Sequence, residues 1–440
     1  MKKYKDNTKA ITPKVSVIIP SLNAGPYIDE AISSVLNQTI YQIEIICVDA
    51  GSTDGTLEII KKHMKQDPRI IFLQSKIKSY GCQMNMGIGR ASGEYVGIVE
   101  ADDYVPKQMY GELYDIAASK DLDIIKADFY RFTGTGDSLN EIYFALTERQ
   151  DLYRRVFEPA KEQGSMLTVN NTWCGIYRRK FLIDNDIRHH ESPGASFQDN
   201  GFFFQTMMHA RRVYFYNRAY YRNRRDNPGS SVFCRNKIYC ICDEYGFIRG
   251  KLIETDMMKI YRDTYNVRLF MEYYGNLGRL RSSDKLEFMH RFAEDFRNLQ
   301  RDGDMDITAF DEVRSEQLKG IMEDPDTYWR IHIRPYDEVF DKAEEYQNII
   351  IYGAASVGWF VLHSLLGRGK GSNIICFAVT KKKPGQNEIY GYPVRQIDHI
   401  VKMKDEAVVV IAAKSQYRPA MRKTAGEMGF SHILEIPEPT

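Results

Sequence analysis

The sequence lacks several features that would tie it to a membrane, to export or to nucleic acid. No apolar run approaches the ~20 residues that a bilayer-spanning helix needs, and no long apolar stretch follows the basic N-terminus to form a secretion signal. The 60 basic residues are balanced by 59 acidic ones, so no net charge draws the whole chain to nucleic acid. We therefore expect a cytoplasmic protein with no nucleic-acid partner, associated at most peripherally with the inner face of a membrane.

The sequence also has few cysteines. Its seven cysteines are scattered along the chain, and Cys240 with Cys242 lacks the spacing of a zinc knuckle. An odd number without a regular pattern is typical of a reducing compartment, which agrees with a cytoplasmic location.

The length and the apolar pattern predict more than one domain. A chain of 440 residues exceeds the roughly 250 to 300 residues at which single cores stop growing. Short β-branched runs alternate with helical stretches in both the first half and the last hundred residues, a pattern typical of α/β sheets. We predict an N-terminal tail over 1–13, an α/β domain over 14–232, a helical connector over 233–345 and a small Rossmann-like α/β domain over 346–440.

Polar clusters follow three predicted strands of the first domain. The strands cover 15–20, 44–50 and 95–101, and the clusters are Pro20 to Asn23, Asp49 to Asp54 and Glu100 to Asp103. Ligands of open α/β sheets lie beyond the carboxyl ends of the strands. The three clusters therefore predict one shared crevice.

The third cluster is the strongest chemical signal. Glu100, Asp102 and Asp103 place three carboxylates within four positions, where they repel one another unless a cation lies among them. Hard oxygen ligands suit Mg²⁺ or Mn²⁺. The residues alone leave open a solvated acidic turn that caps the next helix.

The second cluster combines a carboxylate with turn residues. Gly51 and Gly55 permit tight turns, and Asp49 can accept a hydrogen bond from a base N–H or a ribose hydroxyl. Taken alone, this motif favours a turn followed by a helix cap, in which Asp54 or Thr56 serves the next helix.

In their order and spacing these segments resemble the inverting glycosyltransferases of family 2, which have the GT-A fold. The resemblance runs from Val15 to about Ser231. It implies that Asp49 binds the uracil of a UDP-sugar and that the acidic cluster holds Mn²⁺ or Mg²⁺ on the diphosphate. The implied nucleotide site consists of Pro20, Ser21, Asn23, Asp49, Gly51, Ser52, Asn85 and Asp102, and the implied metal site consists of Glu100, Asp102 and Asp103.

The resemblance also implies a catalytic base. Family members commonly carry Glu-Asp where this chain has Gln198-Asp199, and the aspartate removes the proton of the acceptor hydroxyl. One carboxylate suffices for this step, so we predict that Asp199 is the base. The alternative is an N-cap for a helix that begins near Gly201.

Two departures from the family pattern concern the donor. Ala50 stands where many relatives have a second aspartate, and Met84 occupies a commonly basic position before Asn85. Losing the basic residue removes one diphosphate contact, which Lys76, Lys78 or a later arginine would replace.

Arginines follow the acidic cluster at a distance in sequence. Arg222 and Arg224 share one face of a predicted strand, and the planar guanidinium suits bidentate phosphate binding. We expect one of them to stabilise the leaving diphosphate, with a charged edge strand as the alternative. Trp173 is expected either to stack on a sugar or to fill a core, and His189 and His190 are expected on the surface.

The last domain contains Gly353 to Gly358, which nearly matches a dinucleotide-binding fingerprint. Ala355 stands where a glycine would let the backbone approach a pyrophosphate, and no acidic residue closes the next strand. We therefore favour a structural, acceptor-binding or homo-oligomerising role over NAD binding.

Together these features predict an enzyme of polysaccharide biosynthesis that moves a hexose from a nucleotide-sugar to a glycan, lipid-linked or other hydroxyl acceptor. A nucleotidyltransferase of GT-A-like fold would carry a basic, glycine-rich loop after the first strand, which this sequence lacks. A non-catalytic nucleotide-sugar-binding subunit stays open because of Met84 and Gln198.

Overall fold

The computed structural model describes residues 12–136, 139–227, 229, 237–385, 387–389 and 391–437. Most of the predicted tail over 1–13 and the predicted boundary at 232–233 lie outside these residues. The chain divides into two compact units, Met1–Pro228 with Cys240–Tyr265 and Gly229–Tyr239 with Asn266–Thr440. The division differs from the predicted one, since the segment expected as a separate helical connector is shared between the two units.

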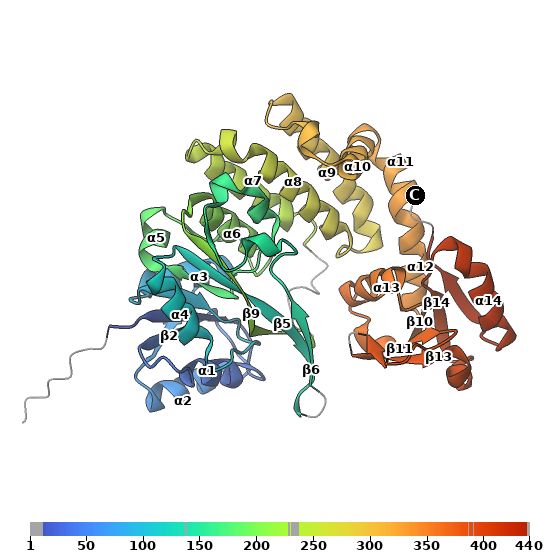
Figure 1. Cartoon of the computed structure of the whole chain (residues 1–440), viewed down its shortest axis with the longest axis horizontal. Coiled ribbons are helices and arrows are strands. Elements are labelled where there is room, and N and C mark those ends of the chain that lie inside the picture. Colours follow the sequence, from blue (N-terminus) through green and yellow to red (C-terminus); the bar gives the residue numbers. More distant parts are fainter. Residues whose placement is uncertain are drawn as a thin grey trace, which may run out of the picture. The chain divides into compact units, whose positions relative to one another are not determined.

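The first unit is built on one mixed sheet (Figure 1). Its strands are β1 (Val15–Ser21), β2 (Ile43–Asp49), β3 (Ile70–Gln74), β4 (Tyr95–Ile98), β5 (Ile124–Thr133), β6 (Asn140–Phe144), β7 (Val156–Phe157), β8 (Gly175–Arg178) and β9 (Val213–Arg224). They run in the order β3-β2-β1-β4-β8-β5-β9-β7, with β6 paired to β5. Because β1 is parallel to both neighbours, β2 and β4, the carboxyl ends of these three strands meet at one edge.

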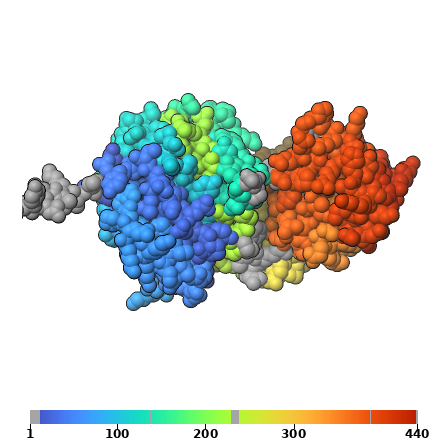
Figure 2. Space-filling model, turned by 90° about the horizontal axis from the view of Figure 1, so that it is seen from below, coloured from blue at the N-terminus to red at the C-terminus, as the bar shows by residue number. Residues whose placement is uncertain are grey.

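The apolar pattern explains the core of this sheet. Every residue of β1 and β2 is buried, as expected for parallel strands covered on both faces. The helices of the first unit are α1 (Ile28–Leu36), α2 (Thr56–Gln66), α3 (Tyr80–Arg90), α4 (Met109–Ser119), α5 (Arg179–Asp184), α6 (Gln198–His209) and α7 (Cys240–Glu254). The predicted α/β fold is confirmed, and in Figure 2 the blue segments of the first α/β repeats form one continuous surface.

The second unit joins helices to a smaller sheet. Its helices are the end of α8 (Met258–Leu277), α9 (Ser282–Arg301), α10 (Glu312–Glu323), α11 (Pro325–Tyr328), α12 (Arg334–Glu344), α13 (Ser356–Gly367) and α14 (Arg418–Glu427). Its strands are β10 (Asn348–Tyr352), β11 (Ile374–Val379), β12 (Glu388–Ile389), β13 (Tyr392–Gln396), β14 (Ala407–Ile411) and β15 (His432–Glu435). A short π-helix, Trp329–Ile333, connects α11 to α12.

The second sheet has the order β12-β13-β11-β10-β14-β15. All its pairs are parallel except β12 with β13. Residues of β10 alternate between two apolar clusters, with Ile349 and Ile351 in one and Ile350 and Tyr352 in the other. The sheet is therefore packed on both faces, and the chain reverses its direction of winding at β10. No described helix of either unit is long and apolar enough to span a bilayer.

Candidate functional site

The predicted strand-end loops of the first sheet lie together. Ser21 at the end of β1 is in register with Asp49 at the end of β2, and the Ser21 hydroxyl donates to Asp49 Oδ2 at 2.9 Å. The acidic loop follows β4 at the same edge. Burial raises the pKa of Glu100 in this loop, and the negative charges of Asp102 and Asp199 raise it further. The three strand-end loops that the sequence singles out therefore lie at one edge of the sheet.

Asp49 is buried, and both oxygens of its carboxylate accept hydrogen bonds from the protein. Its Oδ1 accepts from the N–H groups of Gly51 and Ser52, both at 2.8 Å. Its Oδ2 accepts from the hydroxyls of Ser21 at 2.9 Å and Ser52 at 2.5 Å. Gly51 adopts a positive φ of 90°, which a residue without Cβ tolerates. In this state Asp49 builds the loop, and a uracil would have to displace one of these donors to reach its carboxylate.

The loops after β1 and β2 interlock. Asn23 has a left-handed φ of 53°; its N–H donates to Ser52 Oγ at 2.7 Å and its side-chain oxygen accepts from the Thr53 N–H at 3.0 Å. Pro20 lies inside β1 and is buried, whereas Asn23 is exposed. Of the predicted nucleotide residues in these loops, Asn23 is thus the one that faces solvent, and the others hold its loop in place.

Glu100 is held at the base of the acidic loop. The Tyr80 hydroxyl donates to Glu100 Oε1 at 2.7 Å, and the Glu100 N–H donates to the Tyr221 hydroxyl at 2.9 Å. Burial raises the pKa of Glu100 to about 8, and the negative charges of Asp102 and Asp199 act in the same direction. A cation or a hydrogen-bond donor on a ligand would favour the charged form of this side chain.

Asp103, one of the predicted metal ligands, is hydrogen-bonded to β9. Its Oδ1 accepts from the Arg224 N–H at 2.6 Å and its Oδ2 accepts from the Asn223 amide at 3.1 Å. The side chain is 1% exposed, and burial raises its pKa well above the usual range. Asp103 therefore fastens the acidic loop to β9, and no group of three potential ligands gathers anywhere in the part of the chain that the structure describes.

Asp102 is the carboxylate of this loop that best fits a cation. It is partly exposed, and its Oδ2 accepts from the Asn227 amide at 2.7 Å. Mg²⁺ in phosphate-binding sites is commonly held by one or two carboxylates together with substrate phosphates. The residues therefore fit a cation shared between Asp102, with Glu100 nearby, and a bound diphosphate, and they do not fit an all-protein cage.

Asp199 lies in the first turn of α6, which begins at Gln198. Its Oδ1 accepts from the Asn200 N–H at 3.1 Å, and its charge contributes to raising the pKa of Tyr80 and of Glu100. The N-cap position belongs to Phe197, so the alternative in which Asp199 is the N-cap does not hold. Asp199 thus lies close enough to Glu100 for their charges to interact.

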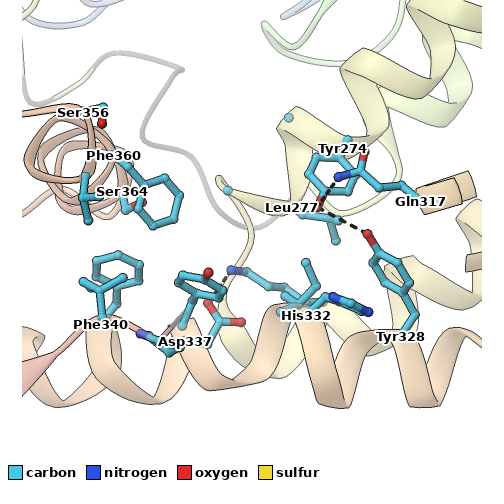
Figure 3. A pocket seen from close by; sticks show the side chains of 18 of the residues that line it. Tyr274, Leu277, Gln317, Tyr328, His332, Asp337, Phe340, Ser356, Phe360 and Ser364 are labelled. Carbon is cyan, nitrogen blue, oxygen red and sulfur yellow. Dashed lines mark hydrogen bonds and ion pairs between the residues drawn. The ribbon is translucent and has the colours of Figure 1, made fainter. Parts of the chain in front are cut away.

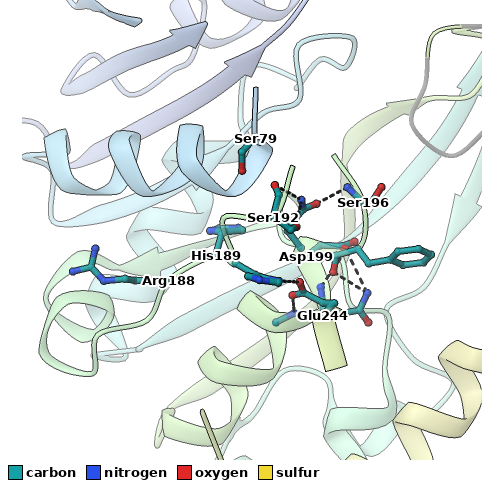
Figure 4. Close-up of polar contacts among 12 residues, drawn as sticks. Ser79, Arg188, His189, Ser192, Ser196, Asp199 and Glu244 are labelled. Carbon is teal, nitrogen blue, oxygen red and sulfur yellow. Dashed lines mark hydrogen bonds and ion pairs between the residues drawn. The ribbon is translucent and has the colours of Figure 1, made fainter. Parts of the chain in front are cut away.

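A carboxylate that the sequence did not reveal contacts the start of this helix. Glu244 of α7 accepts from the Gly201 N–H at 2.8 Å through Oε1, in the first turn of α6. A Cβ at position 201 would collide with Glu244 Oε1, so this close contact requires a glycine. Figure 4 shows Glu244 beside Asp199. Glu244 thereby fixes the end of α6 that carries the predicted base.

Two adjacent histidines approach this region differently. His190 Nδ1 lies 3.0 Å from Glu244 Oε2, and this hydrogen bond raises the pKa of His190. His189, expected on the surface, is 1% exposed and stacks on Phe202 with 4.2 Å between ring centroids. Burial lowers the pKa of His189 to about 3, so His189 is a neutral core residue.

Gln198 and Asn85 fasten the loop that precedes α6. The Gln198 amide donates to Ser192 Oγ at 2.8 Å and to the Gly194 carbonyl at 3.1 Å. Asn85 of α3 accepts from the His189 N–H and donates to the His189 carbonyl, both at 2.9 Å. Both side chains are therefore engaged by the protein itself and hold this loop against α3.

The two arginines of β9 have different partners. Arg224 donates from Nε to the Asp102 carbonyl at 2.9 Å and from Nη2 to Glu30 at 2.8 Å, and its side chain is 5% exposed. Arg222 pairs with Glu141 and lies over the Tyr130 ring at 4.2 Å. Arg224 thus supports the acidic loop directly, whereas the side chain of Arg222 is directed to β6.

Trp173 is half-buried beside the same loop. It stacks on Tyr221 with 4.2 Å between ring centroids and contacts Phe129 edge-on at 4.9 Å. Met84, at the position that is basic in many relatives, is fully buried. Trp173 therefore packs on the residue whose hydroxyl holds Glu100, and Met84 belongs to the core.

Comparison with known proteins places this architecture among its relatives. Residues 16–185 match the sequence model of the glycosyl transferase family 2. The chain is 33% identical over 217 residues to the glycosyltransferase GlyG of Streptococcus pneumoniae serotype 4, covering 48% of this chain and 70% of that protein. It is 30% identical over 232 residues to the cholesterol galactosyltransferase of Borreliella burgdorferi, covering 51% of this chain and 64% of that protein.

A solved structure extends the likeness in fold. The crystal structure of S. aureus TarS 1–349 in complex with UDP-GlcNAc has a TM-score of 0.54 and 21% sequence identity to this chain. The match covers 75% of this chain and 92% of that one. The two proteins therefore share a fold over most of that structure.

Proposed function

Because the chain belongs to the family 2 glycosyltransferases, we propose that it transfers a sugar from a UDP-sugar to a hydroxyl of a glycan or lipid-linked acceptor. The observation that carries this proposal is the meeting of Asp199 with the acidic loop beyond β4. The UDP-GlcNAc complex of a protein with the same fold supports UDP as the nucleotide.

The proposed reaction is a single displacement at the anomeric carbon. The acceptor oxygen forms a bond to that carbon, the bond from the carbon to the diphosphate oxygen breaks, and the acceptor proton passes to the carboxylate of Asp199. Attack opposite the leaving group inverts the anomeric configuration. Glu244 holds the first turn of α6 through Gly201, so the carboxylate of Asp199 is kept at the acceptor side.

The leaving diphosphate gains charge as the bond breaks. Arg224 contacts the backbone of Asp102, which places a cation beside the loop where that charge develops. A divalent cation, Mn²⁺ or Mg²⁺, would be held by Asp102 with Glu100 nearby and would neutralise the diphosphate oxygens when bound. We propose that Asp103 and Asp49 act on the same site indirectly, by holding its two loops.

A donor panel tests the proposal. Nucleotide-sugars are incubated with the full chain, with and without Mn²⁺, and the release of nucleoside diphosphate is measured with and without sugar acceptors. The proposal expects release from a UDP-sugar that depends on the cation. A non-catalytic sugar-binding subunit would bind the donor and release nothing from any of them.

A further inference from the structure

The second unit contains a large cavity of its own. Its volume is about 1180 Å³, and every lining residue belongs to the second unit. Ligand pockets commonly have volumes of about 300–1,000 Å³, so this space can hold a drug-sized or larger molecule. Figure 3 shows Ser356, Phe360 and Ser364 facing Phe340 and Asp337 across it.

The cavity lies where the winding of the second sheet reverses. Ser356 and Val357 at the start of α13 line it, as do Lys414 and Ser415 in the loop after β14. α13 follows β10, and β10 is flanked by β11 on one side and β14 on the other. Such reversal points form the crevice in which doubly wound sheets bind their ligands.

One end of the cavity is suited to an anion. The N-cap of α13 is Ala355, which has no polar side chain to occupy the orphan N–H groups of the first turn. A helix N-terminus attracts phosphate through these N–H groups and the helix dipole. Lys414 is exposed and lines the cavity at the same end, so its charge can reach a ligand.

The glycines of this turn explain why α13 begins so close to the sheet. Gly353 has a φ of 129°, and a Cβ at this position would collide with the Ala412 carbonyl. A Cβ at Gly358 would collide with the Gly353 carbonyl. Both glycines of the near-fingerprint are therefore required by packing, and the start of α13 is brought to the carboxyl ends of β10 and β14.

The walls of the cavity are aromatic. Phe360 is 45% exposed although it is a large apolar side chain, and it contacts Tyr336 at 5.6 Å and Phe340 at 6.0 Å between ring centroids. All three rings line the cavity. Aromatic faces of this kind favour stacking with a planar ring of a ligand.

A buried ion-pair cluster forms part of the cavity wall. The Asp337 side chain is 5% exposed, and its Oδ1 pairs with Lys285 and with Arg368. Its Oδ2 is enclosed by the protein, so this cluster fixes the wall and offers no carboxylate oxygen to a ligand.

We propose that this cavity is a second nucleotide site, taking a nucleoside mono- or diphosphate. The phosphate would lie at the start of α13 beside Lys414, and the base would lie against the aromatic wall. A dinucleotide fits less well, because β11 ends at Val379 without an acidic residue and Ala355 carries a methyl group at the turn. The proposal is independent of the transfer reaction of the first unit.

Titration calorimetry on the full chain tests the site with UDP, ADP and inorganic phosphate as separate ligands. The expected result is two nucleotides per chain for at least one nucleotide. Ser356→Glu puts a carboxylate at the start of α13, where it favours the helix but repels phosphate. We expect Ser356→Glu and Lys414→Glu each to weaken one of the two binding events at least about tenfold and to leave transfer by the first unit unchanged.

Two variants serve as matched controls. Ser283→Glu makes the same change in the first turn of α9, and Lys402→Glu reverses an exposed lysine elsewhere in the same unit. The assignment is overturned if the wild type binds no more than one nucleotide of any kind, or if Ser356→Glu titrates like Ser283→Glu. Inorganic phosphate binding as tightly as the nucleotides would overturn the nucleotide part. Because transfer is assayed on the same samples, failure of the first unit's proposed reaction is seen separately.

Discussion

Both sheets of this chain present loops at the carboxyl ends of parallel strands, but the two edges differ in charge and in how their polar groups are satisfied. At the first edge, Asp49 and Asp103 are buried and bonded by neighbouring loops. At the second edge, Ser356 and Lys414 border a cavity, and the start of α13 lacks a capping side chain.

The carboxylates of the first edge fall into two groups: those that are buried and hold the loops in place, and those that are partly exposed and can contact a ligand. Asp49 and Asp103 each accept at least two hydrogen bonds, Asp49 from the end of β1 and the loop after β2 and Asp103 from β9. Asp102 and Asp199 are partly exposed beside those loops. The first edge is thus an acidic site held by its own buried carboxylates, whereas the second depends on packing glycines and aromatic walls.

The largest effect is expected at Asp199. Asp199→Asn removes the proposed base and should lower kcat by roughly 10²- to 10⁴-fold with little change in UDP affinity. Initial rates and calorimetry measure the two quantities. Asp184→Asn, a change at an exposed carboxylate that ends α5, is the control. Near-normal transfer by Asp199→Asn at saturating substrates would falsify the assignment.

Substitutions of Asp102 and Asp103 should change different properties, the cation dependence of UDP binding and the stability of the fold respectively. Asp103→Ala leaves the Arg224 N–H without its acceptor, so we expect the free energy of unfolding to fall by about 1–3 kcal/mol. Asp102→Ala should leave unfolding nearly unchanged and should abolish the response of UDP binding to Mn²⁺. Urea denaturation and calorimetry distinguish them. Equal losses of stability in the two variants would contradict the division into these two groups of carboxylates.

A smaller effect is expected at the start of α6. Glu244→Ala removes the side-chain acceptor of the Gly201 N–H, which should cost about 1–2 kcal/mol in the free energy of unfolding and lower kcat. Glu254→Ala changes an exposed glutamate at the end of α7, the helix that also carries Glu244, and serves as the control. If Glu244→Ala and Glu254→Ala have the same stability and kcat, Glu244 does not position the helix.

The smallest effect concerns pH. The hydrogen bond to Glu244 raises the pKa of His190 above its ordinary value, so its contribution to stability is complete below an ordinary pKa of about 6.5 and is lost as pH rises through the raised pKa. His190→Gln should flatten the stability curve above about pH 6.5 by less than about 1 kcal/mol.

His209 provides the opposite case within the same unit. Burial lowers the pKa of His209, so the stability that this side chain contributes falls as pH drops below the ordinary histidine pKa of about 6.5. His209→Gln should flatten the curve of stability against pH in that range. Chemical denaturation at several pH values measures both variants. Identical pH profiles for wild type and His190→Gln would show that the contact between His190 and Glu244 does not contribute to stability.

The fold was more accessible from sequence than the site. The apolar runs over 15–20 and 44–50 correspond to β1 and β2 within one residue at either end, because burial on both faces leaves a continuous apolar pattern. The buried face of α1 consists of Ile28, Ala31, Ile32 and Val35, which stand at the spacing of one helical face.

The directions of side chains in the loops could not be predicted. Three carboxylates in one turn point to different sides, so Asp103 faces β9 while Asp102 does not, and sequence spacing carries no sign of this difference. Glu244 contacts a residue 43 positions earlier and lies on a helix without a recognisable motif. The buried acceptor of Asp49 was recognised as a site residue, but its partners were visible only in the folded loops.

The anomeric configuration of the product tests the central claim most directly. Proton NMR follows a reaction of the full chain with an α-linked UDP-sugar and a hydroxyl acceptor, and records both donor loss and the new linkage. A single displacement with Asp199 as base predicts a β-linked product and UDP in equal amounts. An α-linked product would contradict the account.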